Sequence, residues 1–245
     1  MINTMIFDLD GTLVQTERLK ALSYARAAVK LRPRDLDEGV VTVAFKDVVG
    51  LSRREVAQEL LTRFDLTKPA EAQMAALGVN TPWQAYVQLR LRIYEEMLAD
   101  PEVILSNQWP HNMALLQAAR RTCRFVGLAT MSHCTQVQRV LGILALDKAF
   151  DFVASRDDVE HGKPNPEIYL LVAHELGVTP AECLVVEDSP AGVEAALAAR
   201  MAVIAVSTPF TRDRLHAAGL LPAERIVDEP ERVAAVAAAI VQRSR

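Results

Sequence analysis

The sequence of 245 residues contains few cysteines and no long uninterrupted stretch of apolar residues. Its three cysteines, Cys123, Cys134 and Cys183, lie far apart and form no CxxC pair, which argues against a disulfide framework and a zinc site. We expect them to be reduced and to lie in or near the core. No apolar run approaches the roughly 20 residues that cross a bilayer. No basic segment precedes an apolar one at the start, so a secretory signal is not expected either.

Positive charge is also in short supply. The chain has 27 lysines and arginines against 31 acidic residues, which gives a formal net charge of −4. A protein that binds nucleic acid usually presents a basic surface, so we expect no nucleic-acid partner, and we expect no membrane partner. The reduced cysteines predict a cytoplasmic protein, and we expect it to be a monomer.

Short apolar runs, each bounded by turn residues, recur along much of the chain. They are rich in Val, Ile, Leu and Phe and alternate little with polar residues, which is typical of strands buried on both faces of a parallel sheet. The runs are residues 4–8, 124–130, 150–155, 183–188, 201–206 and a shorter one at 225–227. Segments with helical spacing follow most of them, at 133–144, 166–176, 189–200 and 230–241. This alternation predicts a doubly wound α/β fold with a parallel sheet.

One long interval interrupts this alternation. More than a hundred residues separate the first run from the second, and none of them forms a strand-like run. Their patterns are helical, at 16–31, 38–49, 52–63, 70–77 and 81–98. A crossover between parallel strands needs only about a dozen residues. We therefore predict an inserted all-helical domain of residues 16–100 and an α/β core of residues 1–15 and 101–245.

Polar side chains follow the predicted strands at the points where the strands end. In an open α/β sheet, ligands bind at the carboxyl ends of the strands, so we expect these side chains to share one rim. The candidates are Asp8 and Asp10 after the first strand, Thr130 and Ser132 after the second, Lys163 on the loop after the third, and Glu187 and Asp188 after the fourth.

Four carboxylates on one rim need positive charge among them. Two like charges about 4 Å apart repel by on the order of 4 kcal/mol at an effective dielectric of 20. A hard cation with oxygen ligands offsets this repulsion, and Mg²⁺ suits a site whose substrate carries phosphate. Lys163 adds a second positive charge. Thr130 and neighbouring backbone N–H groups supply donors for phosphate oxygens.

These motifs resemble those of the haloacid dehalogenase-like superfamily of phosphotransferases. The resemblance is to the helical-cap branch, which holds β-phosphoglucomutases and sugar-phosphate phosphatases. DLDGT at 8–12 is similar to the nucleophile motif, Thr130 to the second motif, Lys163 in GKPNP to the third, and VVEDS at 185–189 to the fourth. GLSRREV at 50–56 resembles the substrate-recognition loop of the helical cap. The four motifs occur in order on the predicted strand ends, and the resemblance covers nearly the whole chain.

The resemblance implies a Mg²⁺-dependent phosphomonoesterase for a small phosphorylated metabolite, in particular a sugar phosphate. Asp8 is the implied nucleophile, which forms an aspartyl-phosphate. Asp10 is the implied acid and base, which protonates the leaving oxygen and then deprotonates the attacking water. Lys163 and Thr130 are implied to bind the phosphoryl oxygens, and Ser132 is a further candidate for contact with the substrate.

The resemblance also implies the composition of the metal site. Asp8, the backbone carbonyl of Asp10 and Asp188 are the implied ligands of Mg²⁺, and Glu187 assists or orients them. Simpler structural roles stay open for some of these residues. The alternative for Glu187 is that it is simply an acidic residue at a helix start, without a part in metal binding. The alternative for Thr130 is that it only packs at a strand end.

Several positions bear on the substrate. The resemblance implies that Arg53 contacts the distal part of the substrate, although Arg53 and Arg54 can equally be surface residues of a cap helix. Lys20 stands where β-phosphoglucomutase has a hinge histidine, and we count it among the substrate-binding candidates. We therefore expect a phosphatase, with a β-phosphoglucomutase-type mutase as the alternative.

Two further features concern the helices. We interpret residues 90–94 as a solvated helix face. Arg200 stands at a helix end where glycine is usual.

Other enzyme and protein classes fit less well. Asp10 together with Asp188 disfavours a dehalogenase or a phosphonatase, because neither class needs both acids. A signalling receiver also uses aspartate, threonine, lysine and Mg²⁺, but it lacks the inserted helical domain. A dinucleotide-binding oxidoreductase would need GxGxxG after the first strand, and the sequence there is DGTLVQ.

Overall fold

The computed structural model describes residues 1–49 and 51–244, so Gly50 of the predicted recognition loop lies outside the described residues. The chain forms two units, one of Met1–Gln15 with Ile104–Arg245 and the other of Thr16–Val103. We name them the core unit and the cap unit. The short helix α7 (Pro101–Leu105) spans the point where the chain passes from the cap unit back to the core unit.

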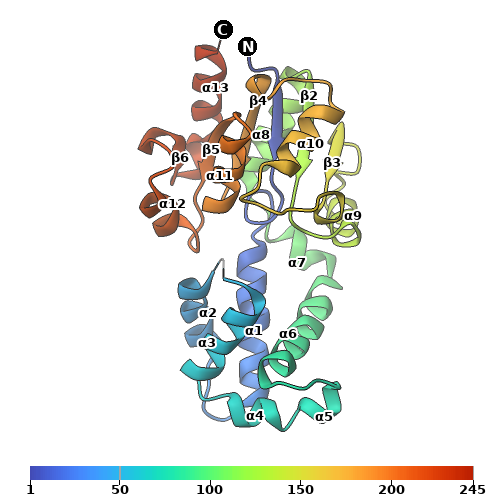
Figure 1. Ribbon diagram of the computed structural model, residues 1–245, viewed down its shortest axis with the longest axis vertical. Coiled ribbons are helices and arrows are strands. Elements are labelled where there is room, and N and C mark those ends of the chain that lie inside the picture. Colours follow the sequence, from blue (N-terminus) through green and yellow to red (C-terminus); the bar gives the residue numbers. More distant parts are fainter. Residues whose placement is uncertain (50, 245) are drawn as a thin grey trace. The chain divides into compact units, whose positions relative to one another are not determined.

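The core unit contains a six-stranded parallel sheet, which confirms the predicted fold class (Figure 1). The strand order is β3-β2-β1-β4-β5-β6, so β1 lies between β2 and β4. Each strand falls within one of the six apolar runs. The bounds are β1 (Thr4–Phe7), β2 (Phe125–Ala129), β3 (Phe152–Ala154), β4 (Cys183–Glu187), β5 (Ala202–Val206) and β6 (Ile226–Val227).

Helices pack on the sheet in two groups. α10 (Glu167–Glu175) and α11 (Pro190–Ala198) contact each other and the strands, and α8 (Pro110–Thr122) and α13 (Val233–Arg243) form a second contacting pair. α9 (Cys134–Ile143) follows β2, and α12 (Arg212–Ala218) follows β5. The sequence patterns did not predict α8 and α12. Cys134 was expected in or near the core, but it is exposed because it begins α9.

The cap unit is entirely helical in its described residues. Its helices are α1 (Thr16–Leu31), α2 (Glu38–Ala44), α3 (Arg53–Arg63), α4 (Thr67–Glu71), α5 (Met74–Leu77) and α6 (Pro82–Leu98), with a 3₁₀ turn at Phe45–Val48. α6 packs against α1, α3, α4 and α5. The hydroxyl of Tyr86 in α6 donates to the carbonyl of Tyr24 in α1 at 2.8 Å, and their rings meet edge to face. This contact fixes α1 and α6 side by side.

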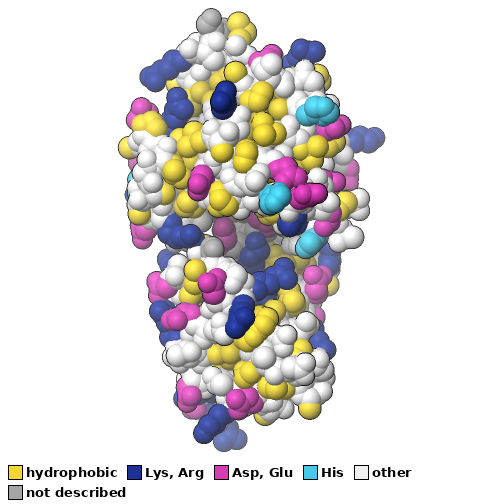
Figure 2. All heavy atoms as spheres, in the orientation of Figure 1, with side chains coloured by type: hydrophobic (Ala, Val, Ile, Leu, Met, Phe, Trp, Pro, Cys, Tyr) yellow, Lys and Arg dark blue, Asp and Glu magenta, His cyan; other side chains and the backbone are white. Residues whose placement is uncertain are grey.

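The described residues include no helix with both the length and the apolar character needed to cross a membrane. On the face shown in Figure 2, acidic, basic and apolar side chains are interspersed over both units.

Candidate active site

The carboxyl ends of three neighbouring strands carry most of the predicted site residues. Asp8 directly follows β1, and its N–H donates to the carbonyl of Val186 in β4 at 3.0 Å. Thr130 directly follows β2, and Glu187 is the last residue of β4. Phe7 at the end of β1 is level with Leu128 of β2 and Val186 of β4. The residues that follow these strands therefore emerge next to one another.

Lys163 lies in the middle of this group. Its ammonium donates to Asp8 Oδ1 at 2.7 Å, to Glu187 Oε1 at 2.5 Å and to the carbonyl oxygen of Ala129 at 3.0 Å. An ammonium has three protons, and each has an oxygen acceptor here. The side chains of Lys163, Asp8 and Glu187 are 5%, 7% and 1% exposed. Water therefore screens these charges little, and each depends on the others.

The charges of this group shift one another's pKa values. Burial raises the pKa of Asp8 well above its ordinary value, against the opposing effect of the Lys163 ammonium. Burial alone would lower the pKa of Lys163, but Asp8 and Glu187 hold it well above its ordinary value. Burial opposes the ionised form of Glu187 too, yet Lys163 and hydrogen bonds keep the pKa of Glu187 low. Lys163 and Glu187 are therefore a buried ion pair beside Asp8.

Tyr169 in α10 completes the surroundings of Lys163, although the sequence patterns did not single it out. It is fully buried. Its hydroxyl donates to Glu187 Oε1 at 3.0 Å, and the Lys163 ammonium lies 4.9 Å from its ring centroid. In the sequence, Tyr169 occupies an ordinary apolar position of a helix. A tyrosine six residues after the motif lysine is the one feature that distinguishes it.

Asp10 lies beside the two hydroxyl residues that follow β2. Thr130 Oγ1 donates to Asp10 Oδ2 at 3.3 Å, and Ser132 Oγ donates to the same oxygen. The Ser132 N–H donates to Thr130 Oγ1 at 3.1 Å, and the Thr130 N–H donates to the carbonyl of Ala154 at 3.0 Å. Thr130, expected to bind phosphate, and Ser132, expected to contact the substrate, thus both contact Asp10 in this structure. The N–H groups of Thr130 and Ser132 are thus bonded within the protein.

Three carboxylates form a group that can hold a metal ion. One oxygen each from Asp8, Glu187 and Asp188 lies within 4.8 Å of the others, and all three residues are buried. The Thr12 hydroxyl donates to Asp188 Oδ1 at 3.5 Å. Carboxylate oxygens are hard donors of the kind that Mg²⁺ prefers, so the donor set fits that ion. The side chain of Asp10 is not part of the group, and the resemblance assigned only its backbone carbonyl to the metal.

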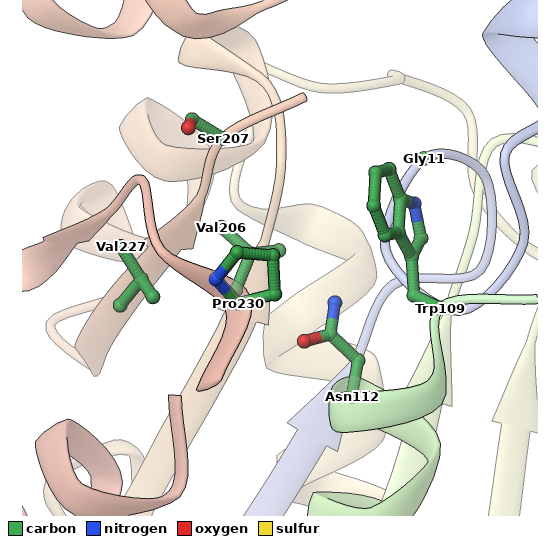
Figure 3. A pocket seen from close by; sticks show the side chains of 7 residues that line it. All are labelled: Gly11, Trp109, Asn112, Val206, Ser207, Val227 and Pro230. Carbon is green, nitrogen blue, oxygen red and sulfur yellow. The ribbon is translucent and has the colours of Figure 1, made fainter. Parts of the chain in front are cut away.

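A small pocket lies beside the loop that carries Asp10 (Figure 3). Its volume is about 10 Å³, enough for about one water molecule. The Asn112 side chain, at the start of α8, donates from Nδ2 to the carbonyl of Thr12 at 2.7 Å. This bond fixes the loop that follows Asp10. The pocket is too small for a metabolite. It is lined by Gly11, Trp109, Asn112, Val206, Ser207, Val227 and Pro230.

In the cap unit, three cations act electrostatically on Tyr24. Burial raises the pKa of the Tyr24 phenol, and the charges of Arg90, Arg53 and Lys20 oppose this rise. Arg53 is the first residue of α3 and is exposed. Arg54, by contrast, places its guanidinium 5.8 Å from the ring centroid of Trp83. The predicted substrate residues Arg53 and Lys20 therefore share one neighbourhood, and we call Lys20, Arg53 and Arg90 the cap cation cluster.

Arg90 corrects the interpretation of 90–94 as a solvated helix face. It is 6% exposed, and its guanidinium lies 4.8 Å from the ring centroid of Tyr24 and 4.9 Å from that of Tyr94. Its Nε is buried and has no hydrogen-bond partner among the described residues. Among the described residues, the groups that act electrostatically on Arg90 are Tyr24, Tyr94, Tyr86 and Arg53, and none of them is a carboxylate. A buried cation without a carboxylate is uncommon, which makes Arg90 a candidate for contact with an anion.

Comparison with known proteins matches this chain to a protein family. A family model described as haloacid dehalogenase-like hydrolase matches residues 2–200. The Phosphorylated carbohydrates phosphatase of Thermotoga maritima is 30% identical over 199 residues, which are 81% of this chain and 82% of that protein. Hexitol phosphatase B of Escherichia coli (strain K12) is 30% identical over 212 residues, which are 83% of each chain.

A solved structure shows the same fold. β-Phosphoglucomutase from Clostridium difficile superposes with a TM-score of 0.65 and 23% sequence identity, over 100% of this chain and 97% of that one. The similarity at this level of identity concerns the fold alone. The matched residues include both the core unit and the cap unit.

Proposed function

The chain belongs to the haloacid dehalogenase-like hydrolase family, and we propose that it is a Mg²⁺-dependent phosphomonoesterase for a small phosphorylated metabolite, with Asp8 as the nucleophile. The observation that carries this proposal is the buried contact of Lys163 with both Asp8 and Glu187. An anionic nucleophile has to approach an anionic phosphate, and a fixed cation beside it lowers the electrostatic cost of that approach. The phosphatase names of the relatives support the same class of reaction.

In the first proposed step, a carboxylate oxygen of Asp8 attacks phosphorus. An O–P bond to Asp8 forms while the P–O bond to the substrate alcohol breaks. Asp10 gives its proton to the leaving oxygen, so the alcohol departs neutral. Lys163 neutralises charge on the phosphoryl oxygens, and Thr130 and Ser132 donate hydrogen bonds once the phosphoryl group has displaced Asp10 from their hydroxyls.

In the second proposed step, water attacks the phosphorus of the aspartyl-phosphate. Asp10 takes a proton from this water, and the O–P bond to Asp8 breaks. Inorganic phosphate is released, the Asp8 carboxylate is restored, and Asp10 carries a proton again. The same residue therefore serves as acid in one step and as base in the next.

Asp8 and Asp188 are the residues we assign chiefly to the metal, with Glu187 beside them, because oxygens of the three lie within 4.8 Å of one another. When bound there, Mg²⁺ would neutralise charge on the phosphoryl group and on the carboxylate of Asp8. Glu187 has a second duty, since its Oε1 accepts hydrogen bonds from Lys163 and Tyr169. We assign Glu187 chiefly to the orientation of Lys163.

The relatives and the cap unit together suggest the substrate class. The two relatives are named for phosphorylated carbohydrates and for hexitol, so we propose a phosphorylated sugar or sugar alcohol. The cap cation cluster is our candidate for the contact with the polar end of the substrate that lies away from the reacting phosphate. Arg90 strengthens this assignment, because it is buried without a carboxylate.

Water, and not a sugar hydroxyl, is the proposed acceptor of the phosphoryl group. A mutase has to exclude water until a bound hydroxyl accepts the group, which requires closure coupled to placement of the acid and base. At the position of the mutase's hinge histidine this chain has Lys20. A neutral imidazole donates one hydrogen bond and accepts another, whereas a protonated lysine only donates. Lys20 therefore cannot replace the hinge histidine in both of these hydrogen bonds.

The test is phosphate release from a panel of hexose, pentose and hexitol phosphates and phosphoglycolate, with Mg²⁺ and with EDTA. We expect release from a subset of sugar or sugar-alcohol phosphates, and only with Mg²⁺. β-Glucose 1-phosphate, with a trace of the bisphosphate activator, should yield little glucose 6-phosphate. No release from any member of the panel would contradict the phosphatase, and efficient isomerisation with almost no free phosphate would make the mutase correct.

A further inference from the structure

Gly192, in the first turn of α11, lies directly against the side chain of Glu187. A Cβ built on Gly192 would lie 1.8 Å from Glu187 Oε1, 1.9 Å from its Cδ and 2.4 Å from its Oε2. Real Cβ atoms essentially never approach another heavy atom within 3.0 Å. The observed position of Glu187 therefore excludes any side chain at residue 192.

The backbone of Gly192 does not itself require glycine. Its φ angle is not among the positive values of the chain, and it lies within a helix, where alanine is more favourable than glycine. Space for the Glu187 carboxylate is what explains a glycine here.

The oxygen that a Cβ would approach most closely is the one that holds Lys163. Oε1 of Glu187 accepts from Lys163 Nζ at 2.5 Å and from the Tyr169 hydroxyl at 3.0 Å. Oε2 accepts from the N–H groups of Asp188 and Ser189, both at 2.9 Å, and from Ser189 Oγ at 3.0 Å. Ser189 Oγ in turn accepts from the Gly192 N–H at 3.1 Å. The start of α11 thus surrounds this carboxylate, which cannot shift without loss of a hydrogen bond.

We propose that Gly192 is a positioning residue for the reaction: it gives the Glu187 carboxylate room against the first turn of α11 and thereby sets Lys163 beside Asp8. The inference rests on the proposed function. A methyl group at residue 192 would force Oε1 from 1.8 Å to at least 3.0 Å away. Lys163 would then follow Glu187 or lose it as a partner. A misplacement of about 1 Å in a catalytic group is enough to cost about 10²-fold in rate.

The first experiment compares Gly192→Ala with a matched helical glycine. In α9, a Cβ on Gly142 would lie 3.7 Å from Asp147 Oδ1, an ordinary contact, so Gly142→Ala should keep the parent kcat within about twofold. Gly192→Ala should lower kcat by about 10²-fold. Its KM should change far less, because Lys163 acts on charge that develops in the transition state. A parental kcat in Gly192→Ala would overturn the proposal.

The second experiment tests whether Gly192 acts through Glu187. Glu187→Asp withdraws the carboxylate by one methylene, so the methyl group of Gly192→Ala has room in that background. We expect Gly192→Ala to lower kcat much less there than in the parent, a coupling that a simple helix effect does not produce. An equal fold-decrease in kcat in the parent and in the Glu187→Asp variant would overturn the proposal.

The free energy of unfolding across the same four proteins gives this coupling without reference to activity. Gly192→Ala should destabilise the parent, and it should not destabilise the Glu187→Asp variant. A loss of folding in both backgrounds would contradict the proposal, whereas a loss in the parent background alone would support it. A parent that releases no phosphate would refute the proposed function, and the unfolding data would still decide whether Gly192 positions Glu187.

Discussion

Lys163→Met removes the cation that, among the described residues, contacts both Asp8 and Glu187, while it keeps an unbranched side chain of similar length. The parent ammonium lies 2.7 Å from Asp8 Oδ1 and 2.5 Å from Glu187 Oε1, with both side chains at least nine-tenths buried. Removal of one partner from a buried ion pair costs about 3–5 kcal/mol, because an uncompensated charge remains. We expect the free energy of unfolding to fall by about 3 kcal/mol at pH 7 in EDTA. This value lies at the low end of that range, because protonation of Asp8 limits the cost.

The sign of the pH dependence follows from Asp8. Burial already raises the pKa of Asp8 in the parent, and without Lys163 it should rise further. A carboxyl whose pKa is higher in the folded state than in the unfolded state binds its proton more tightly when folded, so stability increases as the pH falls. The difference in free energy of unfolding between the parent and Lys163→Met should therefore be smaller at pH 5 than at pH 7.

Urea unfolding followed by circular dichroism measures the stability, and phosphate release with Mg²⁺ measures the activity. We expect kcat/KM to fall by about 10³-fold, since one preorganised donor to a developing charge is worth about 10²–10³-fold. Lys148→Met is the control, because Lys148 is an exposed lysine of the same unit. It should change stability by less than about 0.5 kcal/mol. The reasoning is refuted if Lys163→Met loses less than about 1 kcal/mol and stays within about tenfold of the parent activity.

Two further predictions concern the end of α11 and the cap cation cluster. Arg200 has φ 62° directly after α11, where glycine costs less, so Arg200→Gly should raise stability by about 0.5–1 kcal/mol and Tm by about 1–4 °C. Gly177 has φ 62° after α10, so the opposite substitution, Gly177→Ala, should lower Tm. A lower Tm in Arg200→Gly would contradict this account. Arg90→Met keeps the packing but removes the buried charge, so it should raise KM for a sugar phosphate by at least about tenfold and leave a small aryl phosphate nearly unchanged. Arg53→Ala should act in the same direction, and equal effects on both substrates would assign these arginines to the fold.

The strands and the residues that follow them were predictable because a parallel sheet imposes a simple rule. Its strands are continuous apolar runs, and polar residues at their carboxyl ends face the ligand. This rule places Asp8, Thr130 and Glu187 on neighbouring strand ends, where the structure has them. Lys163 comes from a loop, and its contact with Asp8 depends on the course of the chain between β3 and α10, which the pattern alone does not define.

The supporting residues were not predictable in the same way. Tyr169 occupies an apolar position of α10, and its hydroxyl contact with Glu187 is known only from the structure. Gly192 reads as a weak helix residue until the position of the Glu187 carboxylate is known. Arg90 was misread because an arginine is expected in solvent, yet it lies on the buried face of α6 with Ile93 and Met97, at helical spacing. Each case depends on a tertiary contact that overrides the ordinary preference of the residue type.

The central claim is that Asp8 carries the phosphoryl group between the two steps. The most direct measurement is the mass of the parent enzyme and of Asp8→Asn, quenched in acid during turnover with Mg²⁺ and the best substrate of the panel, with the modified peptide identified. The account predicts that the parent gains the mass of one phosphoryl group on the peptide that contains Asp8, and that Asp8→Asn gains none and does not turn over. Turnover by Asp8→Asn within about tenfold of the parent, or a phosphoryl group on another residue, would contradict it.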